Sequence, residues 1–309
     1  MTGFGARTDP YTQELAEGVF AYVQPDGSWF LNNTGIVVGD DSVVMIDHAG
    51  TERRGRALMD TVGALGGVRP VRSLVNTHHH ADHTFGNYLV PPGTSIIGHE
   101  LCREEVVAAG TAVTGFFDGP DWGDIRIRPP EVTFTGALTL RCGSTRIELR
   151  HFGIPAHTTN DVVAHLPDQG IAFCGDLLFT GGTPFAVQGS IGGWLAALDH
   201  LERLNAPCLV PGHGPVGGVE QIAAVRNYLE FVADSAASAH RRGMSPLEAA
   251  RELDLGEFAG LTDAERIVGN LHRAYVEIDD PGHLGTPLPV AEVFGDMRAY
   301  LGGPLISKA

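Results

Sequence analysis

The 309-residue chain has few charged side chains, and few of those are basic. Charged residues make up 19% of the sequence, against about 25% in an average soluble protein. The 21 Lys and Arg are outnumbered by 37 Asp and Glu, which gives a formal net charge of −16. A chain this acidic, without a stripe of basic residues, repels a phosphate backbone or an anionic lipid surface. We therefore expect neither a nucleic acid nor a membrane as partner.

Cysteines and long apolar runs are also scarce. The four cysteines are far apart and form no CxxC pair, which is typical of reduced, mostly buried thiols in a cytoplasmic protein. No apolar stretch reaches the roughly 18 residues of a transmembrane helix. The segment from Met1 to Asp9 has no basic stretch followed by an apolar run, so the sequence predicts no signal peptide. These absences predict a cytoplasmic location.

The residues that are plentiful predict a layered α/β protein. Hydrophobic residues make up 43% of the chain, enough for a sizeable core, and the 41 glycines indicate many tight turns. Short strand-like runs dominate the first third, with a turn at Asp26-Gly27 and another at Gly39–Asp41. Helical spacing follows over 53–65 and again over 194–204. This alternation of strands and helices predicts packed layers.

The last third of the chain is mainly helical by its spacing. Helices are predicted over 220–242, 246–253 and 263–278. The proline-rich tail after Pro281 is expected to pack as an irregular arm. We therefore divide the chain into a strand-rich domain, residues 1–219, and a helical carboxyl-terminal extension, residues 220–309, packed on it.

A cluster of histidines follows the short apolar run that ends at Val75. It reads His78-His79-His80-Ala81-Asp82-His83. Side chains alternate along an extended segment, so His78 and His80 point the same way, and Asp82 and His83 begin the next turn. One short segment then offers two imidazoles to one metal ion and a carboxylate and an imidazole to a second. The competing interpretation, a solvated histidine tract, explains neither its internal position nor its aspartate.

Three further residues follow strand-like runs in the same manner, and they are His157, Asp176 and His213. Taken singly, each fits an ordinary role as a turn residue, a helix cap or a loop histidine. Taken together, in this order, they complete a set of imidazole and carboxylate ligands without a thiolate. Such a set suits zinc, iron or manganese.

The order H-x-H-x-D-H, then a lone His, an Asp after a strand and a Gly-His-Gly resembles the metallo-β-lactamase superfamily. The resemblance spans Asp47 to His213, and Asp47 corresponds to an acidic structural residue beneath the site. It implies that residues 1–219 are a catalytic domain, an αββα sandwich with the site along one edge between two sheets. It also implies two ions, expected to be Zn²⁺, with Asp176 as the bridge between them. Metal 1 would be held by His78, His80 and His157, and metal 2 by Asp82, His83 and His213.

Departures from the pattern of particular branches narrow the expected activity. Common β-lactamases carry Cys at the position of Asp176, and flavo-diiron relatives carry Glu at the position of His80. The nuclease branch carries large RNA-binding insertions, which this chain lacks in recognisable form. The remaining pattern resembles glyoxalase II-like or lactonase-like hydrolases.

A resemblance over nearly the whole length points to the cyclase/thioesterases of aromatic (type II) polyketide biosynthesis. It rests on phrases such as LVNTHHHADHTFGN at 74–87, PAHTTNDVV at 155–163 and CGDLLFTGGTPF at 174–185. It implies hydrolysis or cyclisation of an acyl thioester in antibiotic biosynthesis, by a metal-bound hydroxide that Asp82 orients as catalytic residue. The alternatives are a lactonase or another ester hydrolase of this fold, and a mononuclear iron enzyme resembling sulfur dioxygenases.

The expected substrate is a small-molecule or carrier-bound acyl group, so an acyl carrier protein is a candidate partner. Such carriers are usually acidic, and the basic docking patch would come from Arg126, Arg128, Arg141 and Arg146. For the acyl group itself we expect an apolar wall built from Trp29, Phe116, Phe117, Trp122 and Phe185. Packing of these aromatic side chains on their own sheet or core is the competing interpretation.

Overall fold

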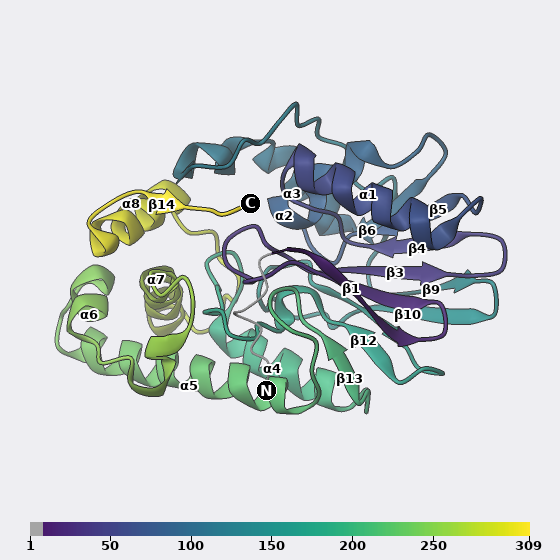
Figure 1. Cartoon of the computed structure of the whole chain (residues 1–309). Coiled ribbons are helices and arrows are strands. Elements are labelled where there is room, and N and C mark those ends of the chain that lie inside the picture. Colours follow the sequence, from purple (N-terminus) through teal and green to yellow (C-terminus); the bar gives the residue numbers. More distant parts are fainter. Residues whose placement is uncertain (1–8) are drawn as a thin grey trace.

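A computed structural model of the chain describes residues 9–309 (Figure 1). Residues 1–8, which carry most of the signal-peptide prediction and begin the predicted catalytic domain, lie outside the described residues. In the described part, two large sheets lie against each other with helices on their outer faces, and a group of further helices stands at one end. None of the described helices is both long and apolar enough to cross a membrane.

The first sheet has the strand order β1-β2-β3-β4-β5-β6-β8. Its strands are β1 (Tyr11–Ala16), β2 (Val19–Val23), β3 (Thr34–Val38), β4 (Val43–Ile46), β5 (Val71–Val75), β6 (Ser95–His99) and β8 (Val132–Phe134). The first four pair antiparallel, and the turn predicted at Gly39–Asp41 between β3 and β4 is confirmed. From β4 onward the strands pair parallel, because α1 (Glu52–Gly66) and α3 (Glu100–Ala109) cross over between them.

The second sheet has the order β13-β12-β11-β10-β9. Its strands are β9 (Ala137–Cys142), β10 (Thr145–His151), β11 (Val162–Leu166), β12 (Ile171–Phe173) and β13 (Cys208–Val210). They pair antiparallel except for β12 and β13, which α4 (Ile191–Glu202) connects. A small parallel pair joins β7 (Phe117–Asp118) to β14 (Leu305–Ile306) near the end of the chain.

Three apolar layers hold the sandwich together. Between the sheets, Ile46 of β4 belongs to one cluster with Leu149 and Phe173 of the second sheet. Outside the first sheet, Met45 packs in a cluster with Leu58 of α1. Outside the second sheet, α4 joins a larger cluster with α5 (Glu220–Arg241). Helix, sheet, sheet and helix therefore follow one another, as the predicted αββα sandwich requires (Figure 1).

The carboxyl-terminal third consists of α5, α6 (Pro246–Glu252), α7 (Arg266–Asp279) and α8 (Val290–Leu301). The three helices predicted there are confirmed to within a few residues. The prediction of an irregular arm after Pro281 is wrong, because α8 and β14 lie in it. The apolar face of α8, which buries Val293, Phe294 and Met297, is short and was obscured by the prolines around it. The division at residue 219 stays a prediction.

Two connections cover the edge of the sandwich where the site lies. The turn signal at Asp26-Gly27 predicted a hairpin, and β2 and β3 do pair, but through a ten-residue connection over 24–33. This connection is long because Trp29, Phe30 and Leu31 fold inward and are buried. The loop over 111–130 contains one 3₁₀ turn (Ala112–Phe116) and β7, and is otherwise irregular.

Candidate metal centre

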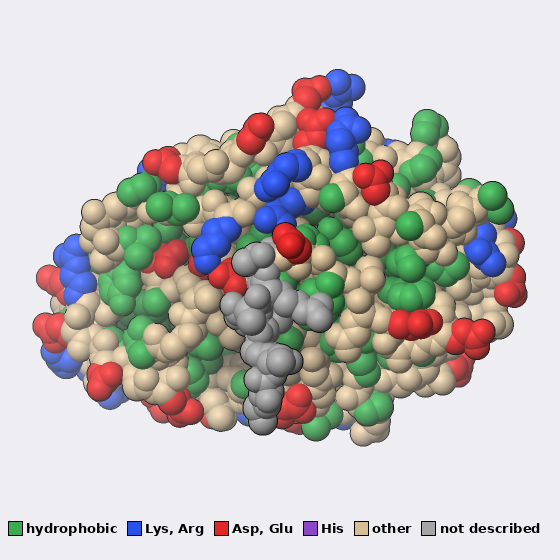
Figure 2. All heavy atoms as spheres, viewed as in Figure 1, with side chains coloured by type: hydrophobic (Ala, Val, Ile, Leu, Met, Phe, Trp, Pro, Cys, Tyr) green, Lys and Arg blue, Asp and Glu red, His purple; other side chains and the backbone are tan. Residues whose placement is uncertain are grey.

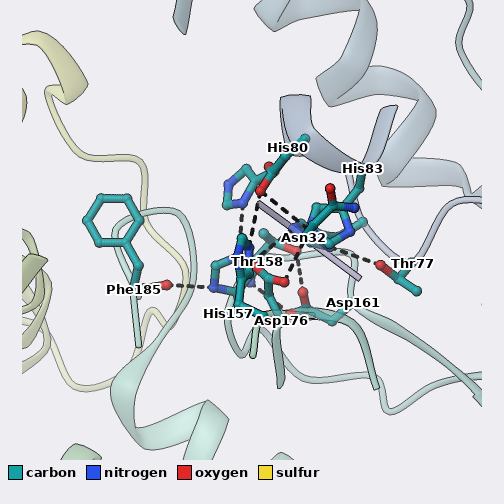
Figure 3. A network of polar contacts seen from close by, with 12 residues as sticks. Asn32, Thr77, His80, His83, His157, Thr158, Asp161, Asp176 and Phe185 are labelled. Carbon is teal, nitrogen blue, oxygen red and sulfur yellow. Dashed lines mark hydrogen bonds and ion pairs between the residues drawn. The ribbon is translucent and has the colours of Figure 1, made fainter. Parts of the chain in front are cut away.

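The seven predicted ligands converge at one edge of the sandwich, where β5, β12 and β13 end. His78 and His80 follow β5, and Asp82 and His83 lie in the short helix α2 (Ala81–Thr84). His157 lies in the connection between β10 and β11. The remaining two ligands, Asp176 and His213, follow β12 and β13. The ends of neighbouring strands thus place residues far apart in sequence side by side (Figure 3).

The first ligand group, group 1, consists of His78, His80, His157 and Asp176, whose ligand atoms all lie within 4.8 Å of one another. The Nε2 of His157 is 2.9 Å from the Nδ1 of His80 and 3.3 Å from the Oδ2 of Asp176. The Nε2 of His78 is buried and makes no hydrogen bond with the described residues. Buried nitrogens that converge without donors between them fit a bound cation.

The second ligand group, group 2, consists of Asp82, His83 and His213, again with ligand atoms within 4.8 Å. The Nε2 of His213 lies 3.1 Å from the Oδ2 of Asp82 and 3.4 Å from the Oδ2 of Asp176. The Oδ1 of Asp176 lies 3.1 Å from the Nε2 of His83. Asp176 therefore stands between the groups, in the position that a bridging carboxylate needs.

Each histidine of the two groups places its other ring nitrogen against an oxygen atom. For His78 this is Thr77 Oγ1 (3.1 Å), for His80 Gln188 Oε1 (2.8 Å), for His83 Asp47 Oδ2 (2.8 Å), for His157 the Phe185 carbonyl (2.6 Å) and for His213 the Gly27 carbonyl (3.0 Å). An acceptor on one ring nitrogen keeps the proton there and leaves the other nitrogen free for a metal. Figure 3 shows the Phe185 carbonyl directed at His157 while the phenyl ring turns away.

Asp47 lies beneath group 2, where the resemblance expects a structural acid. Its carboxylate accepts hydrogen bonds from the backbone N–H of Thr77 (2.7 Å) and from the hydroxyl of Thr77 (2.7 Å), besides the one from His83. Since Thr77 precedes His78, one carboxylate fixes the backbone before the histidine cluster and the ring of His83 together.

Burial and charge act differently on the two groups. In group 1, burial lowers the pKa of His78 and His80 well below the ordinary value and that of His157 to about 4. In group 2, burial also opposes the imidazolium, but the carboxylates of Asp176 and Asp82 together outweigh it and raise the pKa of His213 to about 9. Burial alone would raise the pKa of Asp82, but the interactions with His83 and His213 lower it to about 2.

Two glycines allow the loops around the site to approach closely. A Cβ at Gly212 would lie 1.8 Å from the Oδ1 of Asp176, and one at Gly189 would lie 1.9 Å from the Ala156 carbonyl, next to His157. Both distances are far below van der Waals contact. The close approach therefore requires positions without a side chain.

A cavity of about 510 Å³ opens over both groups. Four of the five aromatic residues predicted for the substrate line it, namely Trp29, Phe116, Phe117 and Phe185. Trp122 does not, since it packs edge-on against Phe30 (4.8 Å between centroids) and Phe85 (6.2 Å), behind the wall. Trp122 therefore lies outside the cavity wall.

The wall also contains side chains that the sequence did not single out, chiefly Phe294 of α8 and Arg266 of α7. The Phe294 ring stacks on Phe116 at 4.5 Å. The Arg266 guanidinium lies 3.8 Å above the Trp29 ring and forms an ion pair with Asp263 (3.0 Å). Neither residue was assigned a role from the sequence, because Phe294 lies in the tail predicted to be irregular. Arg266 lies in DAERIVGNLHRAY at 263–275, a phrase that entered only the resemblance to the polyketide enzymes as a whole.

The four arginines suggested as a docking patch are divided between the two sheets. Arg141 and Arg146 are cross-strand neighbours on β9 and β10, whereas Arg126 and Arg128 precede β8. Arg126, Arg128 and Arg146 each have a carboxylate partner, respectively Asp124, Glu131 and Glu148. On the face shown in Figure 2, basic side chains stand among acidic ones without forming a continuous basic surface.

The family of the chain follows from a comparison with known sequences. Residues 27–213 match the sequence profile described as the Metallo-beta-lactamase superfamily. The chain belongs to this superfamily. Its members are generally metal-dependent hydrolases and typically bind zinc, in keeping with the two ligand groups. The superfamily resemblance and the fold predicted from the sequence are thereby confirmed.

Curated relatives of this superfamily member have diverse activities. The chain is 31% identical over 141 residues to hydroxyacylglutathione hydrolase of Rhodospirillum rubrum, covering 45% of this chain and 46% of that protein. It is 24% identical over 290 residues to a linear primary-alkylsulfatase of Pseudomonas sp., covering 76% and 54%. It is 27% identical over 179 residues to the alpha subunit of a 2,4-dinitroanisole O-demethylase of Nocardioides sp., covering 57% and 51%. The chain spans about half the length of these relatives.

Solved structures agree on the fold. A metallo-beta-lactamase from Pontibacter korlensis superposes with a TM-score of 0.60 at 22% identity, covering 72% of this chain and 99% of that one. A metallo-beta-lactamase from Pseudomonas aeruginosa in its mono-zinc form gives 0.59 at 20% identity, covering 73% and 97%. At this identity the likeness establishes the fold alone.

Proposed function

We propose that this metallo-beta-lactamase superfamily member hydrolyses or cyclises an acyl thioester whose acyl group is apolar and ring-bearing. The observation that carries the proposal is the aromatic cavity, which opens directly onto both ligand groups. Apolar walls with a few converging polar groups are the usual form of a small-molecule site. The thioester carries its acyl group either as a small molecule or on an acyl carrier protein, and the cavity wall recognises the acyl part in both cases.

The residues present fit two zinc ions, one in each group. Five imidazoles and two carboxylates converge, no thiolate is among them, and Asp176 reaches both groups. Bound in this way, the ions would supply Lewis-acid polarisation of the scissile carbonyl and activation of a water molecule. Iron and manganese accept the same ligand types.

The side chains around the groups orient the substrate and the water. Asp82 lines the cavity, and its low pKa keeps it ionised at neutral pH, so it accepts a hydrogen bond and aligns the attacking water. Trp29 packs edge-on against Phe117 and Phe185, and these three rings form an apolar wall that contacts the acyl group and excludes bulk water. The Trp29 indole is itself held by a 2.6 Å hydrogen bond to Glu265.

Two facts support a thioester over other substrates. One of the relatives reported above is a hydroxyacylglutathione hydrolase, which by its name acts on an acylglutathione. In the family resemblance described above, Asp176 also stands where the common β-lactamases carry Cys, which argues against a β-lactam as substrate. The alkylsulfatase relative covers more of the chain, and this makes a sulfate ester the second candidate substrate.

The deciding experiment compares kcat/KM for a bicyclic aryl thioester, an acetyl thioester, a homoserine-type lactone, a β-lactam and a linear alkyl sulfate. The aryl thioester should lead. Trp29→Ala should reduce its lead over the acetyl thioester with zinc content unchanged, because a wall aromatic is lost. The matched control Trp122→Ala, which removes a tryptophan behind the wall, should keep the preference.

A tenfold preference for another substrate would overturn the thioester proposal. Tenfold corresponds to about 1.4 kcal/mol of transition-state stabilisation. If the alkyl sulfate leads by this margin, the second candidate is correct. A lactone or β-lactam lead would refute both.

A further inference from the structure

The segment over 183–192 lies between α7 and group 1, and both sides hold its backbone. One side is a single face of α7, formed by Arg266, Asn270, Arg273 and Glu277. These residues are spaced by four, three and four positions, so they stand above one another along the helix. The other side is made by histidines of group 1.

The first half of the α7 face holds the beginning of the segment. Arg266 Nη1 donates a hydrogen bond to the Thr183 carbonyl (2.9 Å). Asn270 Nδ2 donates to the Pro184 carbonyl (2.8 Å), and its Oδ1 accepts from the N–H of Ala186 (2.8 Å). One amide therefore fixes the chain on both sides of residue 185, whose carbonyl meets His157.

The second half of the face holds the rest of the segment. Arg273 Nη2 donates to the Val187 carbonyl (2.6 Å). Glu277 accepts from the N–H groups of Ile191 (2.8 Å) and Gly192 (3.0 Å) at the start of α4. The contacts run in the same order along the helix and the segment, so hydrogen bonds from α7 fix the segment over its whole length.

On its other side the segment supplies the outer contacts of group 1. The Phe185 carbonyl accepts from His157 Nδ1, and Gln188 Oε1 accepts from His80 Nε2. The N–H of Ser190 donates to the Ala156 carbonyl (2.8 Å), beside His157. Two of the three imidazoles of group 1 thus take their orientation from this segment.

The burial of these polar residues of α7 destabilises the fold. Arg266, Asn270 and Arg273 are each at most 2% exposed, and the Nε and Nη1 of Arg273 find no hydrogen-bond partner within residues 9–309. Burial of an incompletely paired guanidinium destabilises a fold relative to well-packed apolar residues. This cost is understandable if these side chains serve to hold the segment in register.

We propose that this face of α7 positions metal 1, acting through the segment over 183–188, with Gln188 as the positioning residue for His80. The proposal rests on the metal centre of the proposed function and is independent of the substrate. An outer contact fixes the tautomer and the plane of a ligating imidazole, so its loss weakens the metal site and leaves the ligands in place.

The first test removes the Gln188 acceptor with little change in volume. Gln188→Met and the control Gln169→Met, in the turn between β11 and β12, are prepared in a His213→Ala background that disables group 2. Zinc affinity is measured by competition with a chromophoric chelator. Gln188→Met should bind zinc about 10–100-fold more weakly, and the control should be unchanged. Equal affinities within twofold would overturn the proposal.

The second test acts from α7. Arg273→Met loses the contact with Val187, whereas the control His272→Gln alters the face toward α8, where His272 pairs with Asp296 (2.8 Å). Arg273→Met should weaken zinc binding in the same background, and His272→Gln should not. Identical zinc affinities in the two variants would refute the role of α7.

The two tests distinguish a loss of zinc affinity from a failure to fold, and they do not depend on which substrate the enzyme uses. Each variant is first checked for its melting temperature, and if Arg273→Met does not fold, Gln188→Met still decides the proposal. Zinc affinity is measured without substrate, so a failure of the thioester proposal leaves this test intact. A zinc affinity unaffected by Gln188→Met would refute the present proposal whatever the substrate is.

Discussion

The two ligand groups share Asp176 but are held by different parts of the chain. In group 2, His83 is fixed by Asp47 after β4, and His213 by the Gly27 carbonyl in the connection between β2 and β3. In group 1, two histidines are fixed by the segment over 183–188, which α7 grips. One half of the site is thus supported by the beginning of the sandwich and the other half by a helix beyond it.

This difference makes the carboxyl-terminal helices part of the site. Group 2 has its outer contacts inside the αββα sandwich, whereas group 1 depends on residues after 260. Changes to the two supports should therefore separate the two metal sites. Two variants test this separation, beginning with the one that should abolish it, and a third tests the loop that carries His157.

The largest effect is expected from Asp176→Ala. This change removes the one ligand that faces both groups, so the metal content, which we expect to be two ions in the wild type, should fall. Activity should drop by more than the roughly 100-fold typical of outer contacts. Elemental analysis and kcat/KM provide the readout. Wild-type protein with a single iron, unchanged by added zinc, would instead favour the mononuclear iron alternative.

A smaller and one-sided effect is expected from Asp47→Asn. The amide is a weaker acceptor for His83, so zinc affinity at group 2 should fall about 10–100-fold. Group 1 is linked to Asp47 only indirectly, through Thr77 to His78, so its zinc affinity should fall much less. Zinc titrations in a His157→Ala background isolate group 2. Asp41→Asn, in an exposed ion pair with Arg72 at the other end of β4, is the matched control.

The outcome that contradicts the comparison is an equal loss at both groups. If Asp47→Asn weakened group 1 as much as group 2, the two supports would be one connected network. The distinction between the halves of the site would then have no energetic meaning.

The smallest effect concerns His151, which supports the loop that carries His157. Its Nδ1 accepts from the N–H of Gly153 (3.2 Å) and its Nε2 lies 3.3 Å from the Thr159 carbonyl, so its ring spans this loop. Burial, and then the neighbouring ring of His99 (4.0 Å between centroids), lowers the pKa of His151 from 6.5 to about 4. Only the neutral ring can accept from Gly153.

The direction in which the stability changes with pH follows from this lowered pKa. The folded state binds fewer protons than the unfolded state, so the contribution of His151 is complete above pH 6.5 and is lost as the pH falls toward 4. The full shift is worth about 3 kcal/mol, and partial exposure reduces the expected loss to on the order of 1–2 kcal/mol. Urea unfolding of His151→Gln between pH 7.5 and 4.5 should show a correspondingly smaller fall in stability.

A surface histidine provides the control for this titration. His283 is exposed and hydrogen-bonded to Asp280, which raises its pKa, so His283→Gln should not reduce the acid loss. If His151→Gln and the wild type lose stability in parallel on acidification, the ring does not carry the effect.

The sequence was informative where chemistry and spacing are local. His78, His80, Asp82 and His83 lie within six residues at the end of one strand, and the alternation of side chains largely determines how they meet. The distant ligands were identified through the family pattern, since nothing in their neighbourhoods alone distinguishes His157 or His213 from an ordinary loop histidine. The alternation of strand-like and helical runs also predicted layered α/β packing, whereas the two-sheet sandwich was implied by the family resemblance.

The support of group 1 was not predictable in this way. Gln188 belongs to no motif, and its partner His80 is more than one hundred positions away. Arg266, Asn270 and Arg273 form a polar stripe that would normally indicate a solvent-exposed face of a helix, yet the structure buries it. The periodicity of a helix shows which of its faces is polar. It does not show whether that face meets solvent or hydrogen-bonds to the backbone of another segment.

Gly212 and Gly189 determine how substitutions near the site will be tolerated. In a saturation scan, any side chain at 212 must displace the Asp176 carboxylate, and any side chain at 189 must displace the backbone beside His157. Both positions should therefore tolerate substitution as poorly as the metal ligands. An intolerance map would rank two residues without any functional group among the catalytic ones, because their contribution is the volume they leave empty.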